Sequence, residues 1–228
     1  MSITVFQILE KITLEELETK LKKIKPRKEK KINSVTGELE DLIISIEDIK
    51  KNEKHIQGTM KYDDLNFIET RDGTIPIITT NHADFTFMCG SGIFLLINKN
   101  ASDSRIVKQN FALLAFLTQP PSILPCDITP PVMSRFIEDN NCDVFNCSWD
   151  ELDIPRIDKT NLRGAGINNT QDFRRYDNHG QKKSVMFNFP EENVTLSINR
   201  QASVHFYTGW TRDQQESFMR TQILPLCR

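Results

Sequence analysis

The sequence predicts an α+β fold in which a strand–strand–helix unit occurs twice. Three observations lead to this prediction. Apolar and polar residues alternate with a period of two in several short segments, which is typical of half-buried strands. Two segments with apolar residues at helical spacing each follow a group of such strands. The order of the segments is the same in both halves, with an offset of about 110 positions.

The two halves agree segment by segment. In the first half we expect strands at 75–80, 85–89 and 93–97, the last two joined by the tight turn Gly90-Ser91-Gly92, and a helix at 104–117. In the second half we expect strands at 185–189, 194–198 and 203–208 and a helix at 212–224. Two antiparallel units of this kind can join edge to edge into one curved sheet with helices on its convex face, which is the architecture we predict.

The chain before the first repeat is expected to form a helix and a basic linker. Thr13 and Glu16 form a capping box, with the hydroxyl at the N-cap and the carboxylate three residues later, and Pro26 ends the helix. Residues 20–31 hold eight Lys or Arg residues against one acid. Such a run contacts phosphates, serves as a localisation signal, or forms a solvated helix end, and the sequence leaves these interpretations open.

Proline positions predict how the chain is divided. Pro120-Pro121 and Pro130-Pro131 bracket a segment in which Pro excludes a central strand and stops a helix. Residues 140–180 are polar and are expected to be rich in loops. We therefore predict an N-terminal helix and basic linker at 1–36, repeat 1 at 37–118, a Pro-rich connection at 119–139 and repeat 2 at 140–228.

The composition is that of a globular intracellular protein. We see no signal peptide and no apolar run approaching ~18 residues, so no membrane partner is expected. The five scattered cysteines are expected to be reduced thiols in the nucleus or cytoplasm, without zinc-like spacing. Because the net charge is −2, any DNA binding must come from a local basic patch.

Catalytic motifs are not found in the sequence. It has no P-loop, dinucleotide Gly motif or Gly-x-Ser-x-Gly elbow. Asp41, Glu47 and Lys50 are spaced like a nuclease set, but a solvated strand face explains them equally well. The histidines have no Cys or Asp partner at motif spacing: His55, His82, His179 and His205. We expect no enzyme activity, no cofactor or metal, and no small-molecule substrate.

Two stretches resemble the TATA-box-binding protein family. Each repeat of that family has an apolar strand, a turn ending Ser-Gly, a strand ending Thr-Gly and a helix. Residues 89–98, Cys-Gly-Ser-Gly-Ile-Phe-Leu-Leu-Ile-Asn, resemble the first such stretch. Residues 204–209, Val-His-Phe-Tyr-Thr-Gly, resemble the second. The resemblance implies a two-repeat saddle and a DNA-binding transcription initiation factor.

The resemblance also implies binding residues on the concave face of the saddle. This face would contact the DNA minor groove or a covering protein, while Phe94, Leu96, His205 and Tyr207 would pack under the helices. A sheet buried on both sides would instead leave no binding face. The concave-face set is Phe87, Ile93, Leu95, Ile97, Ile198, Val204, Phe206 and Thr208. The phosphate-contacting set is Lys99, Arg105, Lys182, Lys183 and Arg200.

The wedge positions depart from the family pattern. The four intercalating Phe residues fall on Asp72, Cys89, Lys182 and Arg200, so the unstacking wedge is missing. Two functions follow. The first is an initiation factor with atypical contacts to double-stranded DNA and to other transcription-complex proteins. The alternative is a non-catalytic protein-interaction subunit that uses the same fold as a scaffold within a larger complex.

Overall fold

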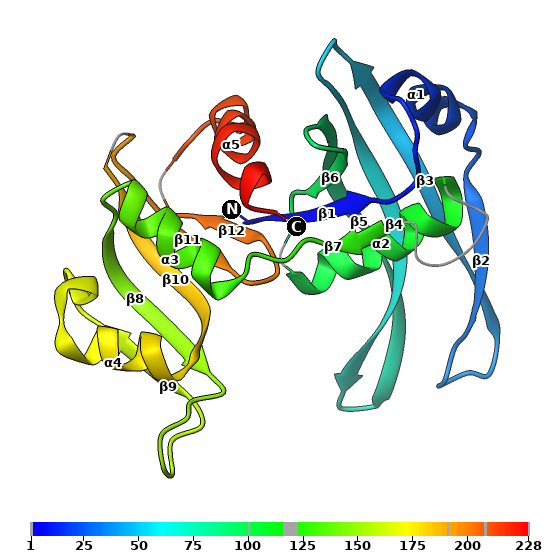
Figure 1. Cartoon of the computed structure of the whole chain (residues 1–228). Coiled ribbons are helices and arrows are strands. Elements are labelled where there is room, and N and C mark those ends of the chain that lie inside the picture. Colours follow the sequence, from blue (N-terminus) through cyan, green and yellow to red (C-terminus); the bar gives the residue numbers. More distant parts are fainter. Residues whose placement is uncertain (1, 100, 116–122, 191, 208, 228) are drawn as a thin grey trace. The chain divides into compact units, whose positions relative to one another are not determined.

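A computed structural model describes the chain except residues 1, 100, 116–122, 191, 208 and 228 (Figure 1). The chain forms two compact units. We call Gln7–Leu124 the inserted unit, and Met1–Phe6 together with Pro125–Arg228 the split unit. Strands of both units pair antiparallel and helices accompany them, so the predicted α+β class is confirmed.

The inserted unit is an antiparallel meander. Its strands follow one another in the order β2-β3-β4-β5-β6, as expected for hairpin-connected neighbours. The β4–β5 ladder pairs His55 with Met88 at one end and Thr70 with Gly73 at the other without a register shift. The elements are α1 (Leu14–Lys23), β2 (Arg27–Ile32), β3 (Leu39–Lys51), β4 (His55–Thr70), β5 (Gly73–Cys89), β6 (Ile93–Ile97) and α2 (Ala101–Ala115).

Helix α1 forms where the sequence predicted it. Thr13 Oγ1 accepts the backbone N–H of Glu16 at 3.2 Å, and Glu16 Oε2 accepts the N–H of Thr13 at 2.8 Å, which completes the capping box. Leu17 and Leu21, one helical turn apart, are buried, and α1 packs on β3 and β4. The charged residues of α1 lie on the opposite, solvated side.

Helix α2 covers the root of the β4–β5 hairpin. The ring of Phe111 meets the ring of Phe85 edge-on with centroids 4.7 Å apart, and that of Phe87 at 5.5 Å. All three rings are buried. Such edge-to-face pairs add to the free energy gained from burying the aromatic area. This aromatic cluster is the core of the inserted unit.

The split unit has the strand order β1-β12-β11-β10-β8-β9. Ser2 pairs with His205 and Thr4 with Ser203, so the first strand completes a sheet made from the last third of the chain. The elements are β1 (Ser2–Ile8), α3 (Pro130–Asp139), β8 (Asp143–Asp150), β9 (Thr160–Arg163), η1 (Ile167–Asn169), α4 (Gln171–His179), β10 (Gln181–Phe189), β11 (Val194–Asn199), β12 (Ser203–Phe206), α5 (Arg212–Phe218), η2 (Met219–Ile223) and η3 (Leu224–Leu226); β7 (Ile123–Pro125) spans the division between units.

Aromatic rings join the helices of the split unit to its sheet. Phe136 of α3 stacks on Phe189 of β10 at 6.0 Å, and Phe218 of α5 meets Phe189 edge-on at 5.3 Å. Trp149 of β8 meets Phe173 of α4 at 5.2 Å. The alternating burial of β10 and β11 places one face of this sheet under the helices.

Several predicted elements are confirmed and others are wrong. The strands at 93–97, 185–189 and 194–198 are confirmed, and the helix expected at 212–224 is helical to Leu226. The segments 75–80 and 85–89, expected as two strands, belong to the single strand β5. Residues 27–32, which lie in the expected basic linker, form the strand β2. The end of the helix expected at 104–117 and the Pro120-Pro121 segment lie outside the described residues.

The boundaries of the units can be compared with the predicted segments. The division after Leu124 falls within the expected connection 119–139. The segment 1–36 is not a separate part, since β1 begins in the split unit and α1 and β2 lie in the inserted unit. Among the described residues, no helix is long and apolar enough to cross a membrane.

Candidate protein-binding site

The far end of the β4–β5 hairpin extends beyond the ladders of its neighbours among the described residues, and only side chains near its base, such as Asp63 and Asp64, still contact β3 and β2. The neighbour β3 pairs with β4 only as far as Tyr62, and β6 pairs with β5 only from Phe85 onward. Residues 63–84 therefore form a two-stranded ribbon, which we call the arm. In Figure 1 the ends of this hairpin and of β2–β3 extend away from α1. Gly73, at φ +125°, closes the tip, a backbone angle that L side chains rarely adopt.

The arm carries exposed apolar side chains on both faces. Cross-strand partners share a face, so Phe67 lies with Pro76, and Ile68 with Ile75 on the opposite face. The side chains of Phe67, Ile68 and Ile75 are 41%, 49% and 49% exposed. Among the described residues, nine of the twelve exposed large apolar side chains lie between positions 32 and 78, and five of these nine are in the arm: Ile32, Val35, Leu39, Ile43, Phe67, Ile68, Ile75, Ile77 and Ile78.

Two properties of the arm indicate a binding surface. A two-stranded ribbon without further strands is marginally stable in water. A consecutive apolar run such as residues 75–78 is typical of a strand that is buried on both faces. Contiguous exposed apolar area on a protein usually marks an interaction site. The arm combines both properties. It is therefore the candidate binding site among the described residues.

The polar face of the inserted sheet has a different character. Lys61 Nζ lies 2.5 Å from Glu47 Oε2, and Thr59 Oγ1 donates to Asp84 Oδ1 at 2.9 Å. The hydrogen bond from the Lys61 ammonium holds the pKa of Glu47 below its ordinary value, so the carboxylate is charged at neutral pH. Acids and bases alternate on this face, which is a poor match for a row of phosphates.

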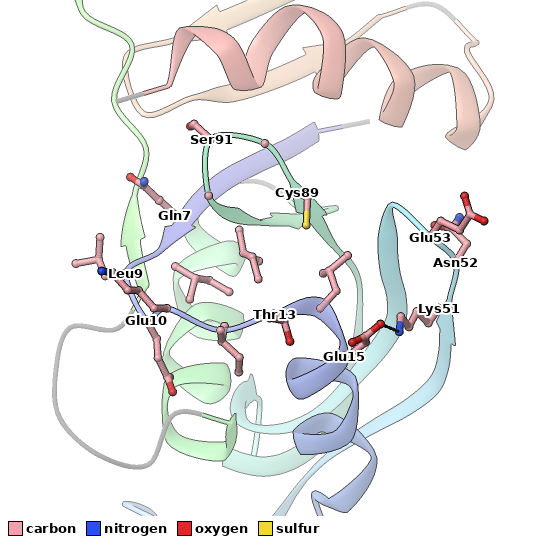
Figure 2. Close-up of a pocket in the computed structure, with 17 residues that line it drawn as sticks. Gln7, Leu9, Glu10, Thr13, Glu15, Lys51, Asn52, Glu53, Cys89 and Ser91 are labelled. Atoms are coloured by element: carbon pink, nitrogen blue, oxygen red, sulfur yellow. Dashed lines mark ion pairs between the residues drawn. The ribbon is translucent and has the colours of Figure 1, made fainter.

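A wide groove of about 1030 Å³ lies where the segment after β1 passes α1 and the β5–β6 turn (Figure 2). Ile8, Leu14 and Ile93 line it, and two of its acids, Glu10 and Glu15, have ion-pair partners. Glu10 pairs with Lys20 at 2.7 Å, and Glu15 with Lys51 at 3.8 Å, the ion pair drawn in Figure 2. The Cys89 thiol lines the groove without any histidine to activate it, so the groove lacks the parts of a cysteine nucleophile site.

A buried lysine lies at a second, polar cleft of about 540 Å³ in the split unit. The side chain of Lys182 is 1% exposed, and its Nζ donates to Ser134 Oγ at 2.6 Å and lies 3.0 Å from Asp177 Oδ1. Trp149 Nε1 donates to the same carboxylate at 3.1 Å. The cluster is a buried ion pair that connects β10 to α4 and α3.

The predicted concave-face residues of the inserted unit are buried under a helix. Phe87 contacts Phe111, and Leu95 and Ile97 share its face because they pair with Phe87 and Phe85. Phe94 and Leu96, on the other face of β6, are buried as well. The expectation of an open face at Phe87, Ile93, Leu95 and Ile97 is thus wrong, and the alternative of a strand buried on both sides holds for β6.

In the split unit the two faces are reversed relative to the prediction. Phe206 lies 6.0 Å from Phe218 of α5, and Ile198 and Val204 are buried on the same side. His205 and Tyr207, expected under the helices, lie on the other face, and Tyr207 is 53% exposed. Because the period of two cannot say which face meets a helix, the alternation was assigned to the wrong side. Thr208 lies outside the described residues.

Two of the five predicted phosphate contacts are already neutralised. Lys182 pairs with Asp177, and Arg200 binds both oxygens of Asp150 at 2.9 and 2.8 Å. Lys182 is buried and therefore not available to a phosphate, which corrects the prediction for it, while the Arg200 guanidinium already binds a carboxylate. Arg105 and Lys183 are exposed and Lys99 is half-buried. These three lie on different segments: Lys99 follows β6, Arg105 lies on α2 and Lys183 lies on β10.

The candidate nuclease residues do not form a site. Asp41 and Glu47 are six residues apart on β3, about 20 Å along the strand, too far to share a metal ion. Lys50 lies beyond Glu47 on the same strand, opposite Gln57. Among the described residues, no group of three His, Cys, Asp or Glu side chains could hold a metal.

Comparison with known proteins brings no assignment. No family model matches the chain, and no curated protein matches it. The resemblance to the TATA-box-binding family therefore rests on the short stretches 89–98 and 204–209 alone.

Sequence reasoning missed the arm, although a signal was present. The run Ile75-Pro76-Ile77-Ile78 has no polar residue, and Phe67-Ile68 is also apolar at two consecutive positions. Alternation fails at both places, which indicates a ribbon that is covered on both faces. No comparable signal marks the Lys182 cluster, because Ser134 is 48 positions away and the nearby Asp177 lies on helix α4, which was not predicted.

Proposed function

We propose that this chain is a non-catalytic protein-interaction subunit that binds its partner through the arm. The observation that carries the proposal is the exposure of Phe67, Ile68 and Ile75 on opposite faces of a two-stranded ribbon. Leaving these side chains in water is unfavourable, and a partner that covers them gains the free energy of apolar burial. The arm is then an anchor that enters the partner.

The charge of the arm favours a protein partner over nucleic acid. Between positions 65 and 78 the one basic residue is Arg71, against the acids Glu69 and Asp72. A β-ribbon that enters a DNA groove needs Lys or Arg to neutralise phosphates. An apolar ribbon with acidic residues at its tip is repelled by phosphates and attracted by an apolar groove.

The two apolar faces favour a partner with a groove over a second copy of the chain. A two-fold pair of arms would cover one face of each ribbon and leave the other exposed. Pro76 lies on the outer edge of β5 and lacks a backbone N–H, which weakens pairing of a further strand at that edge. A groove that closes around the ribbon covers Phe67 on one side and Ile75 on the other.

A two-repeat saddle that contacts DNA is our second candidate, ranked below the protein-interaction role. Support for the duplication comes from the order strand, tight turn, strand, helix, which occurs as β5-β6-α2 and again as β11-β12-α5. The strands β6 and β12 begin 110 positions apart, at Ile93 and Ser203. For DNA binding the remaining support is the exposed basic segment 20–31, because the apolar face residues implied by the family are buried. We therefore place a scaffold role above DNA binding.

Site-specific photocrosslinking tests the proposal. The photoreactive p-benzoylphenylalanine replaces Phe67 in the full chain, expressed in its own cells, and the matched control carries it at the exposed Tyr207. We expect a discrete heterologous adduct from position 67 and none from position 207. The crosslinked protein is then identified, purified and titrated against the unmodified chain.

Two variants separate the arm from general surface effects. Ile75→Asp/Ile77→Asp places charges on one face of the arm, while Ile106→Asp does the same on the exposed side of α2. The arm variant should weaken binding of the purified partner by about 100-fold, since two anchor side chains are lost from the interface. Equal binding by both variants, or adducts between two copies of this chain alone, would refute a heterologous partner at the arm.

A further inference from the structure

The strand β2 forms an unprotected edge of the inserted sheet. It pairs with β3 on one side, and the strand order begins with it. All six of its residues are exposed, and four of them are basic: Arg27, Lys28, Lys30 and Lys31. An edge strand presents a row of backbone N–H and C=O groups to which another strand can bind. In Figure 1 this strand lies at the right margin of the inserted unit.

Hydrogen bonds of the hairpin show which backbone groups face outward. Asn33 donates its N–H to the Glu38 carbonyl at 2.8 Å, so Asn33 is bonded toward β3. Ile43, opposite Lys28, directs its N–H away from β2, to Asp63 Oδ2 at 2.9 Å. Because inward and outward groups alternate along an antiparallel strand, the N–H and C=O groups of Lys28 and Lys30 point to the open edge.

The charge on this edge is only partly balanced by neighbouring acids, of which Asp64 lies 3.4 Å from Lys31 Nζ. Lys28 Nζ lies 3.7 Å from Asp41, and both side chains are exposed, so this pair is weak in water. Within the described part of the chain, neither Arg27 nor Lys30 has an acid within ion-pair distance. The side chains of Lys28 and Lys30 share one face, about 6.7 Å apart. A strand that pairs with this edge carries every second side chain on the same face, also about 6.7 Å apart.

Acidic side chains on β3 favour a single extended chain as the ligand over a nucleic-acid duplex. Asp41 lies opposite Lys30 and Glu40 opposite Lys31, about 4.8 Å further into the sheet. A duplex resting on the sheet meets both rows, and their charges largely cancel. A single extended chain beside the edge meets the basic row alone. The free backbone groups of the same residues add hydrogen bonds that a nucleic acid does not match.

We propose that β2 binds an extended acidic polypeptide by strand addition, with Asp or Glu at alternate positions facing Lys28 and Lys30. The outward backbone groups of these two residues set the register. Their ammonium groups select the acidic sequence. This site adjoins the arm through the Lys31–Asp64 ion pair, but its binding groups are those of Lys28 and Lys30. It does not rest on the function proposed for the arm, so either can fail while the other holds.

Fluorescence anisotropy with the full chain tests this proposal. The probe is a labelled peptide in which Glu alternates with Val. Two matched peptides carry Gln in place of Glu, or N-methyl groups on alternate backbone nitrogens. We expect the first to bind and each matched peptide to bind about tenfold more weakly, because charge and strand pairing both contribute. A single-stranded oligonucleotide serves as the competing anion.

A pair of variants with equal change of charge locates the site. Lys28→Gln/Lys30→Glu alters the edge, and Lys23→Gln/Lys25→Glu alters the same basic run outside β2. All four side chains are exposed, and thermal unfolding confirms that both variants fold. Loss of peptide binding in the edge variant alone supports the proposal. Equal loss in both, no effect of N-methylation, or full displacement by the oligonucleotide overturns it in favour of unspecific or phosphate binding.

Discussion

Lys182 and Asp177 form an ion pair in which the lysine is almost completely enclosed, with Nζ 3.0 Å from Oδ1, and the carboxylate also accepts the Trp149 indole N–H. The pair joins β10 to α4 and, through Ser134, to α3. A buried ammonium that loses its partner is strongly destabilising.

Asp177→Asn should therefore lower the free energy of unfolding by roughly 3 kcal/mol, measured by urea denaturation. The matched control is Asp158→Asn, an exposed side chain of the same unit, which should change stability by less than about 0.5 kcal/mol. Adding Lys182→Met to Asp177→Asn should restore part of the loss, since no charge then remains buried. A double variant no more stable than Asp177→Asn would contradict this account.

Phe111→Ala should cost about 3–5 kcal/mol, because it empties the centre of the Phe85–Phe87–Phe111 cluster. Ile106→Ala, on the same helix but 40% exposed, is the control and should cost far less. The stability of both variants is measured by urea denaturation, from the urea concentration at the midpoint of unfolding with the slope m unchanged. Similar midpoints for the two variants would show that α2 is not held by this cluster.

Gly58→Ala should destabilise the inserted unit by about 1–3 kcal/mol through overpacking. A Cβ at this position would lie 2.6 Å from Cζ of Phe85, whose ring is fixed by α2, and 3.1 Å from the Glu47 carbonyl. Gly209→Ala meets nothing within 4 Å and serves as the control. If the two variants unfold at the same denaturant concentration, the ring of Phe85 has room to move.

Iodoacetamide at neutral pH should alkylate Cys89 first. Its side chain is exposed, whereas Cys126, Cys142 and Cys147 are buried. Burial raises the pKa of the Cys142 thiol to about 12 and raises that of Cys147 as well, so little thiolate forms there. Brief labelling followed by peptide mapping shows the order in which the cysteines are alkylated. Cys89→Ser should remove the fast reaction. Early labelling of Cys147 would mean that the split unit opens readily.

Local features were predictable where one short stretch of sequence decides them. The Thr13–Glu16 capping box, the turn at Gly90-Ser91-Gly92 and the strands on either side of it follow from spacing alone. The segment 27–32 was not predictable in this way. Its lysines have little preference for a strand, and it is a strand because β3 pairs with it. Helix α4 was also missed, since Phe173 is its one buried residue.

The binding residues were less predictable than the elements that carry them. Val204 and Phe206 were correctly placed on one face of a strand, but the face that meets α5 depends on packing between distant segments. Lys182 looked like a phosphate contact because its partner Asp177, although five residues earlier, lies on helix α4, which was not predicted. The apolar arm, in contrast, could have been found from the failed alternation at residues 75–78.

The split unit is completed only when segments on both sides of the inserted unit have been made. Val5 donates its backbone N–H to the Ala202 carbonyl at 3.3 Å, and the whole inserted unit is synthesised between these two residues. On the ribosome the inserted unit can fold as soon as it emerges, while β1 must wait for β12, whose His205 pairs with Ser2 across 203 positions of sequence. Until then β1 can bond only to earlier segments, as when the Val5 carbonyl accepts the Cys126 N–H at 3.2 Å, and in this interval a chaperone or an early-bound partner can act on the edge that β12 will cover.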